Sequence, residues 1–191
     1  MEYTPQFQTD EITTIPFSEF PGFIHNRVVE KKGNVYCILD GASDRTIYPM
    51  LKSNKWDYTC LYKKKIHFEG DRMVDELAAT APYLLLLDPA KMNAESMVRE
   101  RLGKNQMIFF ESSAPKEELD NHCSSMLKAM DEEGKVINFR YYDPRILRVY
   151  LPTCTDEEIF IFFGDIETIW VEDEDEKMLE FIRDKKEEIV E

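Results

Sequence analysis

Short apolar runs alternate with longer polar stretches from residue 33 onward. Four of these runs have the length of strands, and they cover residues 35–39, 56–62, 83–87 and 106–110. The runs at 35–39 and 83–87 show no alternation of polar and apolar residues, which predicts strands covered on both faces. Because helices on both faces usually accompany parallel strands, we expect an α/β fold with a mostly parallel or mixed central sheet flanked by helices.

Helix signals appear in the second half of the chain. Pro115 suits the start of a helix, and apolar residues then repeat at helical spacing through 119–130. Asp143 followed by Pro144 is typical of a helix cap and first turn, which predicts a short helix over 144–151. Thr155 and Glu158 have the spacing of a capping box, and they precede a helix expected to end at Gly164. Further strands are predicted at 136–142 and 166–171.

Three segments differ in pattern. Residues 1–32 carry three prolines and show no clean period, so we expect an irregular lead-in with at most one short helix. Residues 33–175 hold the predicted strands and helices and form the expected folded domain. Residues 176–191 are acidic, with apolar residues at helical spacing, which predicts a C-terminal helix or tail.

Composition and charge exclude several classes of protein. With 43% hydrophobic residues, the 191-residue chain has enough apolar material for a packed core, which excludes a disordered class. The formal net charge of -14 repels phosphate backbones and anionic lipids, so we expect neither nucleic acid nor membrane partners. The first residues lack the positive charge and apolar stretch of a signal peptide, and no apolar run reaches the ~20 residues of a membrane span. We therefore expect a cytoplasmic protein.

The negative charge is concentrated near the C-terminus. Residues 156–191 contain 15 acidic and four basic residues, a balance of -11, whereas residues 1–155 contain 23 acidic and 20 basic residues, a balance of -3. The densest run begins with the four candidate binding residues Glu172, Asp173, Glu174 and Asp175. Such a run either meets a positively charged partner or only increases solubility.

The sequence offers little catalytic or cofactor chemistry. Four cysteines and three histidines are scattered without the spacing of a zinc site, and no glycine-rich phosphate loop occurs. Asp40, at the end of a predicted strand, is either a nucleophile or, together with Ser43 or Asp44, a cap for the following helix, with Gly41 in the turn. A phosphotransferase of the haloacid-dehalogenase type needs a second acid two residues later, where this chain has Ala42. We expect no catalytic residue, no metal and no cofactor, and therefore no enzyme.

A cluster of arginine and tyrosine residues is the other candidate binding site. Its members are Arg140, Tyr141, Tyr142, Arg145 and Arg148. Arginine and tyrosine often carry the binding energy at protein interfaces. Alternatively, Arg140 or Arg145 forms a structural bidentate pair with Asp40 or Asp143 and fixes a strand-to-helix corner. Both interpretations remain open at this stage.

Seven short motifs occur in a fixed order and together resemble a known family. They are Val-Tyr-Cys-Ile-Leu-Asp-Gly-Ala at 35–42, Ile-Tyr-Pro-Met-Leu at 47–51, Cys-Leu-Tyr at 60–62, Glu-Leu-Ala-Ala-Thr-Ala-Pro-Tyr-Leu at 76–84, Phe-Arg-Tyr-Tyr-Asp-Pro-Arg-Ile-Leu-Arg at 139–148, Leu-Pro-Thr-Cys-Thr at 151–155 and Phe-Phe-Gly at 162–164. The chain from 33 to 175 thereby resembles the adaptor domain of bacterial type VI secretion, the Tap or TEC effector chaperones.

The resemblance implies a non-enzymatic cytoplasmic adaptor. Such a protein binds one effector toxin, helps to load it onto the VgrG spike and stays in the producing cell. Two alternatives come from other classes, namely an immunity protein that neutralises a toxin and a small hydrolase or transferase with an unrecognised site. The sequence identifies neither the effector nor the binding face.

Overall fold

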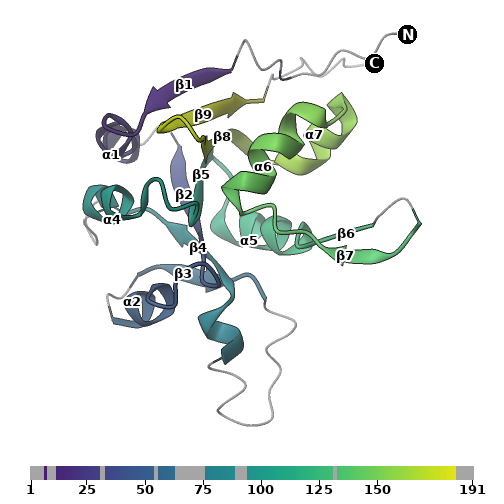
Figure 1. The fold of residues 1–191 in the computed structure, drawn as a ribbon, viewed down its shortest axis with the longest axis horizontal. Coiled ribbons are helices and arrows are strands. Elements are labelled where there is room, and N and C mark those ends of the chain that lie inside the picture. The colour runs from purple at the N-terminus through teal and green to yellow at the C-terminus, as the bar shows by residue number, and fades with distance from the viewer. Residues whose placement is uncertain are drawn as a thin grey trace.

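Seven strands form one sheet in a computed structural model that describes residues 7, 12–30, 33–53, 56–62, 76–88, 94–130 and 133–183. The strand order is β1-β9-β8-β5-β2-β4-β3 (Figure 1). The strands are β1 (Thr13–Pro16), β2 (Asn34–Asp40), β3 (Tyr58–Cys60), β4 (Pro82–Leu86), β5 (Met107–Ser112), β8 (Ile166–Glu172) and β9 (Lys177–Ile182). A separate two-stranded sheet consists of β6 (Lys128–Met130) and β7 (Val136–Asn138).

The expectation of a mostly parallel or mixed sheet is wrong, because every neighbouring pair of strands in the seven-stranded sheet is antiparallel. Two of the helical connections join strands of the same direction, but these strands are not neighbours. β2 and β3 run the same way with β4 between them, and β4 and β5 run the same way with β2 between them. Each of these two crossovers skips one strand position, and an antiparallel strand occupies that position.

Helices cover both faces of the sheet, as the unbroken apolar runs predict. They are α1 (Phe20–Glu30), α2 (Ile47–Ser53), α4 (Ala94–Arg101), α5 (Lys116–Ser125), α6 (Pro144–Tyr150) and α7 (Asp156–Phe163), with a 3-10 turn at Leu151–Thr153. Residues 76–79 are also helical. Figure 1 shows α1, α2 and α4 on one side of the sheet and α5, α6 and α7 on the other. The molecule is therefore an α/β protein with three layers.

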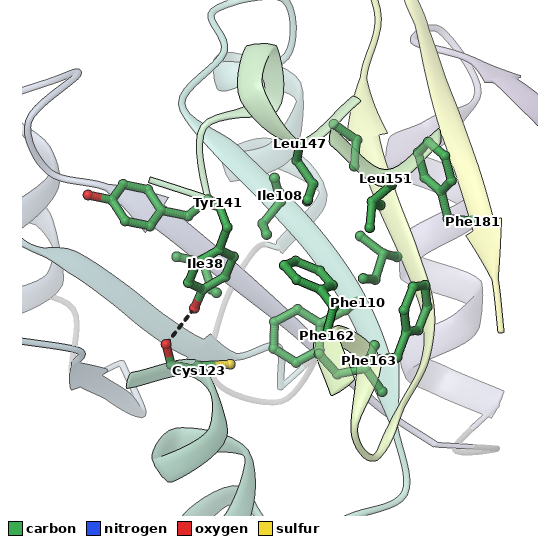
Figure 2. Close-up of a cluster of buried hydrophobic side chains, with 14 of the residues drawn as sticks. Ile38, Ile108, Phe110, Cys123, Tyr141, Leu147, Leu151, Phe162, Phe163 and Phe181 are labelled. Atoms are coloured by element: carbon green, nitrogen blue, oxygen red, sulfur yellow. Dashed lines mark hydrogen bonds between the residues drawn. The ribbon is translucent and has the colours of Figure 1, made fainter. Parts of the chain in front are cut away.

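The buried side chains divide between the two faces by strand position. Ile38 and Phe110 point into a core that α5, α6 and α7 close (Figure 2), and Tyr36 belongs to the same core. Cys37 and Phe109, at alternate positions of the same strands, belong to the opposite core under α1, α2 and α4. This alternation is the ordinary period of two along a strand. Both positions are apolar because both faces are covered.

The predicted helix caps are present. Asp143 accepts a hydrogen bond from the Arg145 amide at the start of α6, and Thr155 and Glu158 form a complete capping box at α7. Gly164 ends α7 with a φ of 52°, a conformation that favours glycine. The helical period predicted through 119–130 stops earlier, because α5 ends at Ser125 and the chain turns into β6.

The two ends of the described chain differ from expectation. The predicted irregular lead-in contributes β1 and the 11-residue α1, and the predicted C-terminal helix is wrong because residues 177–182 form β9. Met178 and Phe181 are buried at a spacing of three, which a helix also produces, but hydrogen bonding to β8 fixes the segment as a strand. Residues 184–191 lie outside the described residues. No helix in the described ranges has the length and apolar character of a membrane span.

Leu85 provides a test of the double-sided burial. Leu85 is fully buried in β4, whereas Leu86 on the opposite face is half-buried. Leu85→Asp should unfold the domain, because an unpaired buried charge costs several kcal/mol against a total stability of about 5–15 kcal/mol. Val149→Asp, at a position that is 64% exposed on α6, should change stability by less than about 1 kcal/mol. Urea denaturation of both variants checks this, and a stable Leu85→Asp protein would contradict the burial of β4.

Candidate protein-binding site

The arginine and tyrosine cluster lies at the corner where β2 ends. An Arg140 guanidinium nitrogen donates to Asp40 Oδ2 at 2.6 Å, across 100 positions of sequence. The Asp40 side chain is fully buried and also accepts from the Ala42 amide at 3.0 Å, whereas the Arg140 side chain is 43% exposed. The structural pair predicted for Arg140 is therefore present, and Asp40 has no contact with solvent.

A second pair lies beside the first. Arg145 Nε and a terminal guanidinium nitrogen donate to the two Asp143 oxygens at 2.9 and 2.7 Å. Burial of Asp143 opposes its ionisation, but the hydrogen bonds from Arg145 outweigh that effect and lower the pKa of Asp143. The pair holds the first turn of α6, while most of the Arg145 side chain stays exposed.

Tyr141 and Tyr142 belong to the core rather than to the surface, since each is only 1% exposed. The Tyr141 hydroxyl donates to the Cys123 carbonyl at 2.9 Å, the dashed contact in Figure 2. The Tyr142 hydroxyl lies 3.3 Å from that of Tyr62, which follows β3. Burial raises the pKa of both Tyr141 and Tyr142, so they remain neutral phenols.

The turn after Asp40 depends on a close approach of two backbones. The Gly41 amide donates to the Ala81 carbonyl at 3.0 Å, and a Cβ on Gly41 would lie 2.6 Å from that oxygen. A larger residue therefore does not fit at position 41. Four of the seven motifs meet here, since they contribute Asp40 and Gly41, Tyr62, Ala81, and the 139–148 segment.

The acidic run forms a turn between two strands. The Asp173 amide donates to the Lys177 carbonyl at 2.8 Å, which closes the connection from β8 to β9. Glu174 and Asp175 are exposed at its tip. Glu172 is 1% exposed and accepts from the Asn105 amide at 3.0 Å, so it presents no charge to a partner. Burial raises the pKa of Glu172 to about 7.

Arg148 brings the two predicted clusters together. Its guanidinium pairs with the exposed Glu174 carboxylate and donates to the Glu172 carbonyl at 3.4 Å. The Arg148 side chain is only 14% exposed, so it holds α6 against the β8–β9 turn. Among the predicted binding residues, Arg140, Arg145, Glu174 and Asp175 retain substantial exposure. Contact of these residues with a partner stays a prediction.

A pocket of about 660 Å³ opens beside the corner. Its apolar lining comes from Leu61, Leu127 and Phe139, together with the rings of Tyr62 and Tyr142. Its other lining residues are polar or positively charged: Asn121, Ser124, Ser125, Lys128, Asn138 and Arg140. The volume lies within the usual range of ligand pockets, about 300–1,000 Å³. This mixed lining is suited to an amphipathic group.

Large apolar side chains are exposed on elements near the pocket and on α6 and α7. Met130 and Val136 on the β6–β7 hairpin are 73% and 58% exposed. Phe160 and Ile161 on α7 are 69% and 65% exposed, although α7 is apolar around its whole circumference after the first turn. Helices that are apolar on every side are normally buried, and exposed apolar patches mark protein-interaction surfaces. These exposures favour binding of a protein partner.

Nucleophiles and metal ligands are poorly placed for chemistry in the described structure. Cys123 is fully buried, and burial raises its pKa to about 12. His122 Nε2 lies 2.8 Å from the Phe162 carbonyl, so a backbone contact holds the ring. Within the described ranges, no three His, Cys, Asp or Glu side chains gather to form a metal site.

The pocket residues were not predicted from the sequence, apart from Arg140 and Tyr142. The signal that could have indicated α5 is the spacing of Asn121, Ser124 and Ser125, which places three small polar residues on one side of a helix. Lys128 and Asn138 gave no such signal, because their approach depends on the register of the β6–β7 hairpin.

The Asp40–Arg140 pair predicts an asymmetry between two variants. Arg140→Ala should lower the free energy of unfolding by about 3 kcal/mol, because it leaves a buried carboxylate without its cation. Asp40→Asn should cost less, about 1 kcal/mol, because water reaches the half-exposed Arg140. Arg99→Ala, which removes an exposed pair with Glu95, is the control and should cost about 0.5 kcal/mol or less. Equal losses for the first two variants in urea denaturation would contradict this account.

Glu172 predicts a pH dependence of stability. The pKa of Glu172 in the folded protein is about 7, above its value in the unfolded chain. Its contribution to the free energy of unfolding is therefore fully present below about pH 4.5 and is lost as pH rises through about 7. Glu172→Gln should therefore stabilise the protein at pH 8 by about 3 kcal/mol, and by much less at pH 5. The exposed Glu174→Gln is the matched control. Denaturation midpoints measured from pH 4.5 to 8 check this, and parallel curves for wild type and Glu172→Gln would count against it.

Comparisons with known proteins give one match. The family model described as a domain of unknown function, DUF4123, matches residues 35–159, which include all but the first residue of β2, the Asp40–Arg140 corner and every pocket-lining residue. The chain matches no curated protein and no solved structure. The match covers most of the 191 residues, and the chain therefore belongs to the DUF4123 family, which is associated with the effector adaptors of type VI secretion.

Proposed function

We propose that this protein is a non-enzymatic cytoplasmic adaptor that binds one type VI secretion effector and promotes its loading onto the VgrG spike. The observation that carries the proposal is the DUF4123 match over residues 35–159, since that family is associated with such adaptors. The match spans β3, β4, β5 and the arginine and tyrosine cluster, and it ends within α7, before the acidic run at 172–175.

Surface features support a protein partner. Large apolar side chains are exposed on α6, α7 and the β6–β7 hairpin, in a chain whose net charge of -14 disfavours nucleic acid and anionic lipid. The most plausible catalytic aspartate of the sequence, Asp40, is fully buried in an ion pair and cannot reach a substrate from solvent. These observations support binding rather than catalysis.

Deletion of the gene in the native bacterium tests the proposal. Export of one effector should fall at least tenfold, while other effectors leave the cell normally, and the full-length chain should restore export. Quantitative mass spectrometry of culture supernatants measures this. The purified adaptor–effector complex should retain the toxic activity of the effector. Unchanged export would contradict the proposal, and an inactive toxin in the complex, with self-intoxication of the deletion strain, would favour an immunity protein instead.

A further inference from the structure

The β6–β7 hairpin extends the surface of the pocket. Lys128 pairs with Asn138 in the register of the hairpin, and both side chains line the pocket. Met130 and Val136 are also paired, two residues farther along each strand, so they lie on the same face as Lys128 and Asn138. The pocket and the two exposed apolar side chains therefore form one continuous surface, here called the hairpin face.

The hairpin face is a surface that a further polypeptide segment would stabilise by covering it. The hairpin projects from the body of the molecule (Figure 1). An isolated two-stranded hairpin is marginally stable in water and gains stability when a third strand or another layer covers it. Such a covering layer would remove the exposed side chains of Met130 and Val136 from water, which is favourable for apolar groups. A small ligand inside the pocket would leave these two side chains exposed, whereas a polypeptide segment would cover both.

Charge indicates what kind of segment fits. Lys128 and Arg140 are the charged residues that line the pocket in the described structure, and no Asp or Glu lines it there, although the whole chain carries -14. Arg140 is already neutralised by Asp40, whereas Lys128 has no ion-pair partner among the described residues. Asn121 and Ser125 add neutral hydrogen-bonding groups on the facing side of the pocket. A carboxylate is therefore the complementary charge for this surface.

We infer that the hairpin face binds a short segment of the cargo protein in which apolar side chains accompany a carboxylate. The apolar side chains cover Met130 and Val136 and enter the pocket between Leu61 and Phe139, and the carboxylate pairs with Lys128. This inference rests on the proposed adaptor function for the identity of the occupant. The chemistry of recognition follows from the surface itself.

A phage-displayed library of random 12-residue peptides tests the chemistry without the effector. The full-length protein should enrich peptides that carry Leu, Ile or Phe beside Asp or Glu. A synthetic consensus peptide should bind at least tenfold more weakly to Ser125→Trp, which fills the pocket, and to Val136→Asp, which removes an apolar contact. Lys128→Glu should remove the preference for acidic peptides. Val29→Asp, at an exposed position of α1 on the other side of the sheet, is the matched control and should bind like the wild type.

Several results would overturn the inference. These are the absence of enriched peptides, a consensus without acidic residues, and equal binding by the three site variants and the control. A concentration-dependent dimer in analytical ultracentrifugation that Val136→Asp abolishes would assign the face to a second copy of this chain instead. Thermal melting of each variant verifies folding, and Ser125 and Val136 are both exposed, so their replacement should leave the fold intact.

Export assays with the same variants separate this inference from the proposed function. If deletion of the gene abolishes export but Ser125→Trp and Val136→Asp restore it fully, the adaptor function stands and the hairpin face is not the cargo site. If the variants lose both peptide binding and export while the Val29→Asp control retains both, the inference is supported. If peptides bind as expected but deletion leaves export unchanged, the proposed function fails, and the cargo assignment fails with it.

Discussion

The buried carboxylate of Asp40 and the guanidinium of Arg140 join two distant parts of the chain. Asp40 ends a central strand of the sheet, and Arg140 precedes α6 in the long connection between β5 and β8. A charge removed from water is tolerated only when a partner and hydrogen bonds compensate it. The corner therefore forms as a unit, and the pocket wall and the start of α6 take their positions from it.

Local features of the fold could be predicted from the sequence, whereas strand direction could not. The caps at Asp143 and Thr155 were predicted correctly, because a cap depends on residues only two or three positions away. The burial of β2 and β4 on both faces followed from their unbroken apolar runs. The prediction of parallel pairing was wrong. The apolar pattern indicates which faces of a strand are covered, but it does not indicate which strand lies between two others in the sheet.

Less of the candidate site than of the fold could be predicted, because the site also depends on contacts between residues far apart in the sequence. Arg140 and Arg145 were identified by residue type, and their pairing with Asp40 and Asp143 was one of two open interpretations. Lys128 and the polar residues of α5 were missed, because tertiary packing brings them together. The motif residues hold the corner, and six of the eleven described residues that line the pocket beside it lie outside the motifs. Residues of α5 and the hairpin can thus change without loss of the buried ion pair.

The neighbouring strands β5 and β8 are far apart in the sequence, which affects the folding of the newly made polypeptide. On the ribosome, β5 emerges before its neighbour β8, which follows only after α5, the hairpin, α6 and α7. Until then one edge of β5 carries unpaired amide and carbonyl groups, the kind of edge that templates association with other strands. Strand pairs of such long sequence separation also form slowly. A nascent copy of this protein therefore passes through a stage in which it is itself prone to aggregation, and β8 and β9 end that stage when they complete the sheet.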